Sequence, residues 1–296
     1  MLITLNKRSF TRILLSGVLL LSSSVHAKDT DEAMRIVSAA GALTEIIYEL
    51  GAEDKLVGVD TTSIFPKAAT ELPQVGYQRA LSAEGILSLS PSILLATEEA
   101  GPPAVIDQLQ STKLPIMIIP IEYTTEGVAK KIRAVSKAVG KESAGQTLIA
   151  KLEAKMAALD TKIKANVSEP KRTIFIMSMG GGSPMVAGLH TAANAMINIS
   201  GGINPMTSYQ GYKPINIESL VNINPEVIIV TKRTMEGLGG MDEIMKIPGL
   251  TMTDAAKNKQ VAVLEDMSTL GFTPRLAEAA NTIYQSIYPT AAQAAE

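Results

Sequence analysis

A tyrosine and an arginine two positions apart carry the most specific chemistry in this sequence. Tyr77 follows Gly76 and precedes Arg79, in a segment between Pro73 and a helix expected to begin near Ser82. A phenolate oxygen suits ferric iron, but a free phenol ionises only near pH 10, so a neighbouring cation has to favour the anion. Arg79 can supply that cation or bind a carboxylate through two parallel hydrogen bonds. By residue type alone, an ordinary loop tyrosine beside an exposed arginine fits better.

A pattern of twelve residues occurs twice, 134 positions apart. The copies are EGILSLSPSILL at residues 84–95 and ESLVNINPEVII at residues 218–229. Each predicts a short helix that ends at its proline and leads into a buried strand, with Ser82 and Asn216 as the capping residues. Two copies so far apart indicate two similar α/β lobes, and a cleft between lobes is a common place for a small ligand.

The apolar runs of the chain fit an α/β fold. Unbroken stretches of Ile, Val, Leu and Met alternate with helical patterns, which is typical of a parallel sheet covered on both faces. In the first lobe we expect strands at residues 35–38, 56–60, 93–96 and 116–120, and helices at 42–50 and 105–110. In the second lobe we expect strands at residues 172–177, 227–231 and 261–264. We therefore predict two Rossmann-like lobes with central parallel sheets, joined by one long helix, with a ligand cleft between the lobes.

The long helix is expected between the two lobes. Residues 141–167 are rich in strong helix formers, and a helix over residues 142–165 would be roughly 36 Å long. It fits either a surface helix packed on one lobe or a stiff strut that joins both, and we favour the strut. The predicted organisation is a signal peptide at residues 1–27, an N-terminal lobe at 28–140, a connecting helix at 141–167 and a C-terminal lobe at 168–296.

The start of the chain has the pattern of a secretory signal. Lys7, Arg8 and Arg12 precede or enter a short apolar stretch at residues 13–21, and Ala27 closes a small-residue cleavage site. The apolar stretch is too short to span a bilayer. The chain also has no cysteine for a disulfide or a lipid anchor. We expect an exported protein that is free in the periplasm, neither lipid-anchored nor membrane-embedded, and monomeric.

Charge and composition exclude several functional classes. After the signal, 24 basic side chains stand against 29 acidic ones, with no basic tract of the kind that binds nucleic acid. The same part of the chain has one histidine, His190, and no Ser-His-Asp set or metal-ligand cluster at a useful spacing. We therefore predict no catalytic residues and a binding protein rather than an enzyme.

The order of lobe, helix and lobe, with the two acid-to-proline units, resembles a known family. It is similar to the helical-backbone periplasmic binding proteins that serve ABC importers of vitamin B12, ferric siderophores and heme. Three segments look like the heme-binding members of the HmuT type: GYQRALSAEG at residues 76–85, PMVAGLHTAANAMI at 184–197 and YQGY at 209–212. The resemblance covers essentially the whole chain after the signal.

The resemblance implies a carrier that captures ferric heme and delivers it to an inner-membrane permease dimer with its ATPase subunits. Heme would be the transported ligand, not a catalytic cofactor. Tyr77 would be the axial ligand of the iron, as a tyrosine is in catalase, with Arg79 in contact with the heme. Glu84 and Glu218 match the acids that dock onto permease arginines, although the helix dipole alone stabilises an acid in a first turn by roughly 0.3–1 kcal/mol. A ferric siderophore or corrinoid carrier of the same fold is the alternative.

The second lobe offers four further candidates for contact with heme: Met179, His190, Tyr209 and Tyr212. Some heme binders carry a histidine where this chain has Met179, and a thioether is a softer ligand for ferric iron. Met179 is then a weak sixth ligand, packs on the porphyrin, or leaves the iron five-coordinate with Tyr77 alone. We favour the last two together. The absence of a strong ligand here argues against two stacked hemes, since each lobe would need one. His190, before the helix cap Thr191, fits a surface residue or one that lines the cleft better than an iron ligand. Tyr209 and Tyr212 fit contact with the porphyrin or loop packing.

Overall fold

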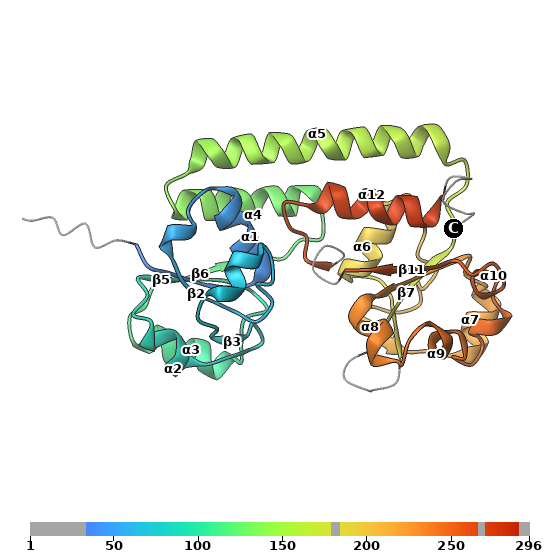
Figure 1. Cartoon of the computed structure of the whole chain (residues 1–296), viewed down its shortest axis with the longest axis horizontal. Coiled ribbons are helices and arrows are strands. Elements are labelled where there is room, and N and C mark those ends of the chain that lie inside the picture. The colour runs from blue at the N-terminus through green and yellow to red at the C-terminus, as the bar shows by residue number, and fades with distance from the viewer. Residues whose placement is uncertain (1–33, 179–183, 266–269, 290–296) are drawn as a thin grey trace, which may run out of the picture. The chain divides into compact units, whose positions relative to one another are not determined.

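The computed structural model describes residues 34–178, 184–265 and 270–289, which belong to one compact unit. Two β-sheets organise this unit, and each sheet has helices on both faces (Figure 1). The α/β class and the two lobes predicted above are confirmed. The limits of the lobes at residues 28–140, 141–167 and 168–296 stay predictions, and the predicted signal peptide lies outside the described residues.

Four parallel strands form the sheet of the first lobe, in the order β2-β1-β5-β6. They are β1 (Ile36–Ala39), β2 (Leu56–Val59), β5 (Ile93–Thr97) and β6 (Ile116–Ile119). One face carries α1 (Gly41–Glu49) and α4 (Thr125–Ala138), and the other carries α2 (Ala83–Ser88) and α3 (Pro103–Ser111) (Figure 1). The short elements are the hairpin strands β3 (Gly76–Tyr77) and β4 (Ala80–Leu81) and the 3-10 turns η1 (Glu53–Lys55) and η2 (Lys67–Glu71). All four strands were predicted from the sequence, whereas α4 was not.

The sheet of the second lobe has five strands in the order β11-β10-β7-β8-β9. They are β7 (Thr173–Met177), β8 (Met185–Ala187), β9 (Tyr212–Pro214), β10 (Val227–Thr231) and β11 (Val261–Leu264). The three predicted strands, β7, β10 and β11, form the parallel part. The unpredicted β8 runs antiparallel to β7 and β9, because the seven residues between β7 and β8 are too few for a parallel crossover.

Helices cover both faces of this second sheet. One face carries α6 (Ala192–Ile199) and α12 (Leu276–Ile287). The other carries α7 (Ile217–Ile223), α8 (Lys232–Gly237), α9 (Met241–Met245), η3 (Leu250–Met252) and α10 (Asp254–Lys257) (Figure 1).

The two lobes repeat one another in detail. The strand order β1-β5-β6 recurs as β7-β10-β11, and the duplicated sequence forms α2 with β5 and α7 with β10. Ser90 and Asn224, each directly before the repeated proline, both adopt left-handed backbone angles, with φ of 46° and 45°. A residue before proline avoids the right-handed helical region, which ends each helix there. The Nε of Arg35 donates to Ser90 O at 2.9 Å, and that of Arg172 to Asn224 O at 3.0 Å.

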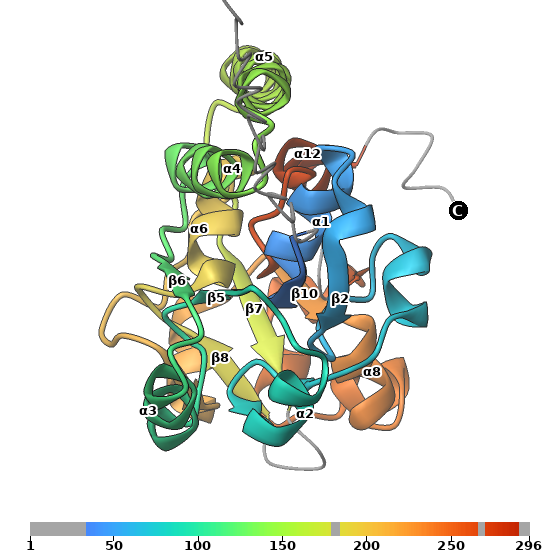
Figure 2. The same ribbon diagram turned by 90° about the vertical axis from the view of Figure 1, so that its left-hand side faces the viewer.

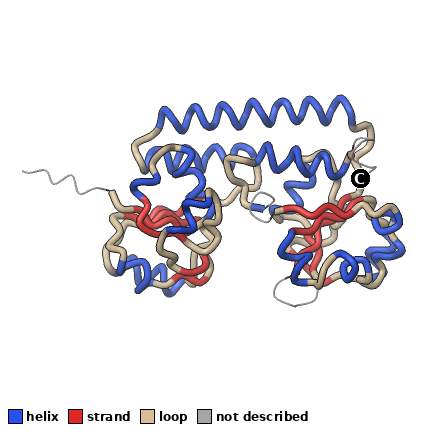
Figure 3. Tube along the Cα trace, viewed as in Figure 1, coloured by secondary structure: helices blue, strands red, loops and turns tan. Residues whose placement is uncertain are grey.

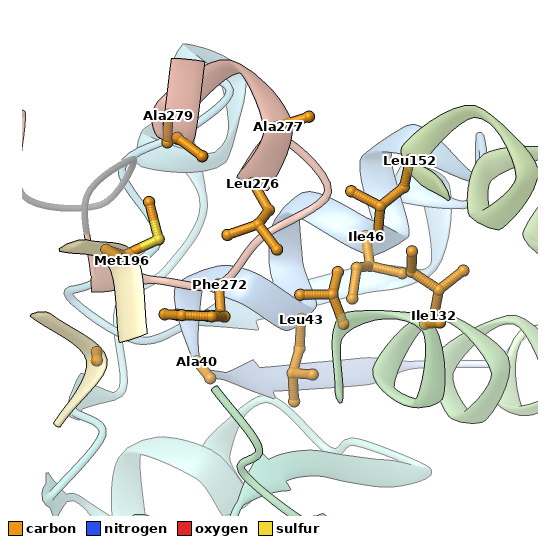
Figure 4. Close-up of a cluster of buried hydrophobic side chains, with 14 of the residues drawn as sticks. Ala40, Leu43, Ile46, Ile132, Leu152, Met196, Phe272, Leu276, Ala277 and Ala279 are labelled. Atoms are coloured by element: carbon orange, nitrogen blue, oxygen red, sulfur yellow. The ribbon is translucent and has the colours of Figure 1, made fainter. Parts of the chain in front are cut away.

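One apolar core is common to both lobes. Alternate residues of a strand face opposite sides of its sheet, so in β1 Ile36 joins the common core while Val37 joins a core confined to the first lobe. Figure 4 shows how side chains from several helices meet in the common core, among them Leu43, Ile132, Leu152, Met196 and Leu276. The cores against α2 and α3, and against α7 and α9, each belong to a single lobe.

The helix α5 (Glu142–Asn166) confirms the helix expected at residues 142–165. It forms an outer layer over α4 of the first lobe and α12 of the second (Figure 2), and it runs without interruption (Figure 3). Gly145 allows close approach to α4, because a Cβ there would lie 2.4 Å from the hydroxyl oxygen of Ser136. Lys155 pairs with Glu278 on α12. These contacts with both lobes fit the strut rather than a helix packed on one lobe.

Two polar contacts also join the lobes. Arg275, just before α12, donates from Nε and Nη2 to the two carboxylate oxygens of Glu45 on α1, at 3.1 and 3.0 Å. The Glu45 side chain is only 2% exposed, and the Arg275 guanidinium lies 3.8 Å from the centroid of the Phe65 ring. Lys131 on α4 donates to Phe272 O at 2.8 Å. Removing the charge of Arg275 or of Glu45 leaves the charge of the other uncompensated.

We expect Arg275→Ala to lower the free energy of unfolding by about 3 kcal/mol, because the buried Glu45 carboxylate loses its counter-charge. The measurement is urea denaturation at neutral pH. Lys155→Ala is the matched control: its pair with Glu278 also joins two elements but is exposed (59% and 49%), so its loss should be below about 1 kcal/mol. Equal losses in the two variants would contradict this role of the buried pair.

Candidate ligand-binding cavity

A cavity of about 490 Å³ lies between the two lobes. It adjoins the carboxyl ends of strands in both sheets, which is where ligands bind in parallel α/β sheets. The first lobe contributes Gly41, Thr62, Tyr77, Arg79, Glu99, Tyr123 and Lys131 to its wall. The second lobe contributes Met177, Met185, His190, Thr191, Tyr212 and Phe272. The predicted cleft between the lobes is therefore present, and four of the predicted site residues meet in it: Tyr77, Arg79, His190 and Tyr212.

Tyr77 lies in the β3–β4 hairpin, opposite Ala80, and is 41% exposed. Gly76 before it has φ of 100°, and a Cβ there would lie 2.7 Å from Ala80 O, so the hairpin requires glycine. Backbone bonds tie the hairpin to the following loop: Gly101 N donates to Gln78 O at 2.9 Å, and Leu81 N donates to Gly101 O at 2.8 Å. The loop expected around Tyr77 is thus a short, fixed hairpin.

A buried carboxylate supports this hairpin through hydrogen bonds. Asp60, 1% exposed, accepts hydrogen bonds from the backbone and hydroxyl of Thr62 at 3.0 and 2.7 Å and from the Ser63 hydroxyl at 2.9 Å. It also accepts from the backbone of Gln78, at the turn of the hairpin. Burial raises the pKa of Asp60, and these hydrogen bonds oppose the rise. Thr62 in turn accepts from the backbone N–H of Gly41 at 2.9 Å, which joins the hairpin to the first turn of α1.

Arg79 forms an ion pair with Glu99 at the cavity wall. Partial burial disfavours the charge of the guanidinium, but Glu99, Tyr77 and Tyr123 outweigh it and raise the pKa of Arg79. Burial raises the pKa of Tyr123, as does Glu99, while Arg79 lowers it. Arg79 therefore lies within electrostatic range of the Tyr77 side chain, while its guanidinium is paired with Glu99.

The second-lobe wall combines thioethers, aromatic rings and one histidine. Met177 ends β7, and Met185 begins β8, so both flank the segment that contains Met179. His190, with φ of 58°, lines the cavity and precedes Thr191, whose hydroxyl caps α6 by accepting from Asn194 N at 3.0 Å. Thr191 is thus the helix cap that the sequence predicts.

Tyr212 and Tyr209 have different surroundings. Burial raises the pKa of Tyr212 to about 12, and a hydrogen bond with Thr191 opposes the rise; this phenol stays protonated at neutral pH. Tyr209 is not among the described residues that line the cavity. Its hydroxyl donates to Val186 O at 3.1 Å and its ring packs on Gly188. The loop-packing alternative therefore describes Tyr209, and Met179 lies outside the described residues.

Several wall residues were not predicted from the sequence. Glu99 and Tyr123 come from the loops after β5 and β6, Lys131 comes from α4, and Phe272 reaches the cavity from the second lobe. The rings of Tyr123 and Phe272 lie 5.3 Å apart between centroids. Glu99 follows a predicted strand, so its position at the carboxyl end of that strand could have identified it as a candidate site residue. Lys131 lies on the unpredicted α4, and nothing in its sequence neighbourhood marks it.

The two acids of the repeat lie away from the cavity wall. Glu84 and Glu218 are exposed in the first turns of α2 and α7, whose caps are Ser82 and Asn216, as predicted. The caps accept from Gly85 N at 3.0 Å and Ser219 N at 2.8 Å. Both helices pack on the sheet faces opposite the common core, and so on the side away from α5 in Figure 1.

Residues 36–267 match the family described as periplasmic binding protein. The chain belongs to this family. The family and its solved structures are substrate-binding proteins rather than enzymes, which confirms that class for the chain.

Three similar proteins show which kinds of substrate-binding protein the chain resembles. The periplasmic heme-binding protein BhuT, solved in complex with two hemes, is 35% identical with a TM-score of 0.82 over 86% of this chain and 97% of that one. The uncharacterised ABC transporter substrate-binding lipoprotein YvrC of Bacillus subtilis is 26% identical over 87% of this chain and 81% of its own. A vitamin B12-binding protein of Vibrio campbellii is 28% identical over 70% and 74%. The chain is thus the substrate-binding protein of an ABC importer and resembles binders of two different tetrapyrrole-like ligands.

In the part of the chain that the structure describes, no helix is long and apolar enough to cross a membrane. One relative is a lipoprotein, so the predicted absence of a lipid anchor stays a prediction, as does the monomeric state.

We expect Asp60→Ala to loosen the hairpin that carries Tyr77, because the Gln78 backbone and the hydroxyls of Thr62 and Ser63 lose their acceptor. The free energy of unfolding should fall by about 2–3 kcal/mol. The direct measurement is hydrogen exchange of the amides of residues 76–81, which should become faster than in the wild type. Asp107→Ala, an exposed acid on α3, is the control, and unchanged exchange in Asp60→Ala would rule out the support.

Proposed function

We propose that the protein captures ferric heme in this cavity, with Tyr77 as the axial iron ligand, and delivers it to an ABC permease. The observation that carries the proposal is a tyrosine held on a fixed hairpin, with a guanidinium beside it, in the wall of a largely apolar and aromatic cavity. A phenolate is a matched ligand for ferric iron, and the Arg79 guanidinium lies near the Tyr77 side chain. The 35% identity to a heme-binding protein supports the same ligand.

On the other face of the porphyrin we propose packing rather than a strong second ligand. Met177, Met185 and Tyr212 line the second-lobe wall, and the raised pKa of Tyr212, about 12, makes a second phenolate costly there. His190 lines the same wall and is the remaining nitrogen donor on it. One heme per protein is the expected stoichiometry, although BhuT was solved with two.

A corrinoid carrier is the second candidate, favoured by the relatives named as vitamin B12-binding proteins. The side chains of a corrinoid are largely neutral amides, whereas heme carries two carboxylates. The described cavity wall contains two cations, Arg79 and Lys131, against one acid, Glu99, and this net positive charge suits the carboxylates of heme. We therefore keep heme as the proposed ligand.

We further propose that Glu84 and Glu218 dock the loaded carrier onto the permease. They are related by the internal repeat, one acid for each lobe, and both are exposed on the faces opposite the common core. Such a pair suits a permease dimer that presents two equivalent cationic sites. Export by the signal peptide at residues 1–27 and a free monomeric state belong to the same proposal.

The first experiment is an absorption titration of the protein with hemin. The wild type should form a saturable 1:1 complex with the bands of high-spin ferric tyrosinate. Tyr77→Phe should lose these bands and bind at least about tenfold more weakly, about 1.4 kcal/mol. Tyr212→Phe is the control and should keep the bands, because its phenol is protonated at neutral pH.

Two outcomes of this titration would redirect the assignment. Tyrosinate bands that survive in Tyr77→Phe would exclude Tyr77 as the ligand. A wild-type protein that does not bind hemin but binds cobalamin would move the proposal to the corrinoid carrier.

For docking, we expect Glu84→Ala and Glu218→Ala each to lower heme uptake in reconstituted vesicles several-fold, and the double variant to abolish it, with hemin affinity unchanged. Each lost contact is one charge-assisted hydrogen bond at an interface. Glu142→Ala removes an exposed acid from the first turn of α5 and is the matched control. Normal uptake by the double variant would refute docking through these acids.

A further inference from the structure

A lysine is buried in the wall of the cavity, and none of the described acidic residues is in contact with it. Lys131 on α4 is 3% exposed and lines the cavity beside Tyr123 and Glu99. Among the described residues, its ammonium makes one hydrogen bond, to Phe272 O at 2.8 Å, and no ion pair within 4.0 Å. An ammonium has three donors, so two of its N–H groups lack a protein acceptor there.

The nearby acid is already engaged. Glu99 pairs with Arg79 and also accepts from the Gln78 side chain at 3.4 Å. Its charge reaches Lys131 only as a weaker, longer-range attraction: burial lowers the pKa of Lys131 to about 8, and Glu99 merely opposes that shift. The ammonium is therefore still the main form at neutral pH, in a place where a buried charge costs several kcal/mol unless it is paired.

The contact with Phe272 O does not require a charge. A neutral donor would satisfy one carbonyl, and the lobes are already joined by the common core and the pair of Glu45 with Arg275. A neutral donor in place of the Lys131 ammonium could not, however, attract an anion into the cavity by its charge. Among the described residues, the other ionisable groups that line it are a single guanidinium, one carboxylate, one imidazole and three phenols, namely Arg79, Glu99, His190, Tyr77, Tyr123 and Tyr212.

We propose that Lys131 is a carboxylate subsite of the cavity, which binds one acidic side chain of the ligand and so selects an acidic ligand over an uncharged one of the same shape. The inference rests on the proposed heme-binding function and extends it. Lys131 acts on specificity: it distinguishes a diacid porphyrin from an ester or amide analogue, while Tyr77 holds the iron in either case.

The experiment compares hemin with hemin dimethyl ester, in which both carboxylates are methylated and uncharged, in the same detergent buffer at pH 7. The measured quantity is the ratio of their dissociation constants. Wild type should prefer hemin, and Lys131→Met should reduce that preference about ten- to hundredfold, the value of a buried hydrogen bond to a charged group. Lys130→Met is the matched control: it is the adjacent lysine on α4, exposed and paired with Glu122, and should leave the ratio unchanged.

A second measurement covers the case in which Lys131→Met does not fold. In the wild type, the preference for hemin should fall as the pH rises through about 8, the pKa of Lys131, because the ammonium form is lost above that value. The ester serves as the reference, since any change at the iron affects both probes alike. Lys131→Arg, which keeps the charge, should retain the preference at pH 9.

The outcomes separate this inference from the function on which it rests. An equal ratio in wild type and folded Lys131→Met, or a wild-type ratio that does not change with pH, would overturn the subsite while leaving the heme carrier in place. A wild-type protein that binds neither probe would overturn the proposed function, and the subsite with it.

Discussion

The apolar core that both lobes share is the constraint on which the rest of the structure depends. It joins the α1 side of the first sheet to the α6 and α12 side of the second, and α5 covers it from outside. Burial of apolar area, rather than the few polar contacts between the lobes, supplies most of this connection. A hinge motion that separated the lobes would have to expose part of this core, so the cavity walls face one another at a nearly fixed spacing. Such a cavity suits a rigid, flat ligand whose shape matches the gap.

The strands and the repeat could be predicted because they depend on local patterns. An uninterrupted run such as that of β10 must be buried on both faces, and a residue before proline cannot continue a helix, so the repeat around Ser90 and Asn224 predicted both helix ends. The antiparallel strands β8 and β9 were missed because each has only three residues. The helix α4 was not predicted, although its buried residues, among them Val128, Ile132 and Val135, recur at helical spacing.

The site was only partly predictable, since a cavity is formed by residues that tertiary packing brings together. Tyr77 and Arg79 are marked by a local motif, and both lie in the wall. Lys131 and Phe272 are 141 positions apart in the sequence and meet only because α4 and the segment before α12 both pack on the common core. Tyr209 shows the opposite case. It lies in one of the segments on which the resemblance rests, but its hydroxyl donates a hydrogen bond within its own lobe. Local chemistry therefore predicted candidates, while packing decided which of them share a cavity.

In each lobe, the acid of the repeat lies on the same short segment as a tyrosine of the cavity wall. In the first lobe, the hairpin that carries Tyr77 leads directly into α2 and Glu84, and Ser82, the cap of α2, bonds back to the chain just before β3. In the second lobe, β9 begins with Tyr212 and leads into α7 and Glu218. Glu84 follows Tyr77 by seven positions, and Glu218 follows Tyr212 by six. Under the proposed docking, a permease that binds both acids therefore holds segments that lead directly to the two walls of the cavity. Release can then follow from a local displacement of these two segments, without the opening of the lobes that the shared core opposes.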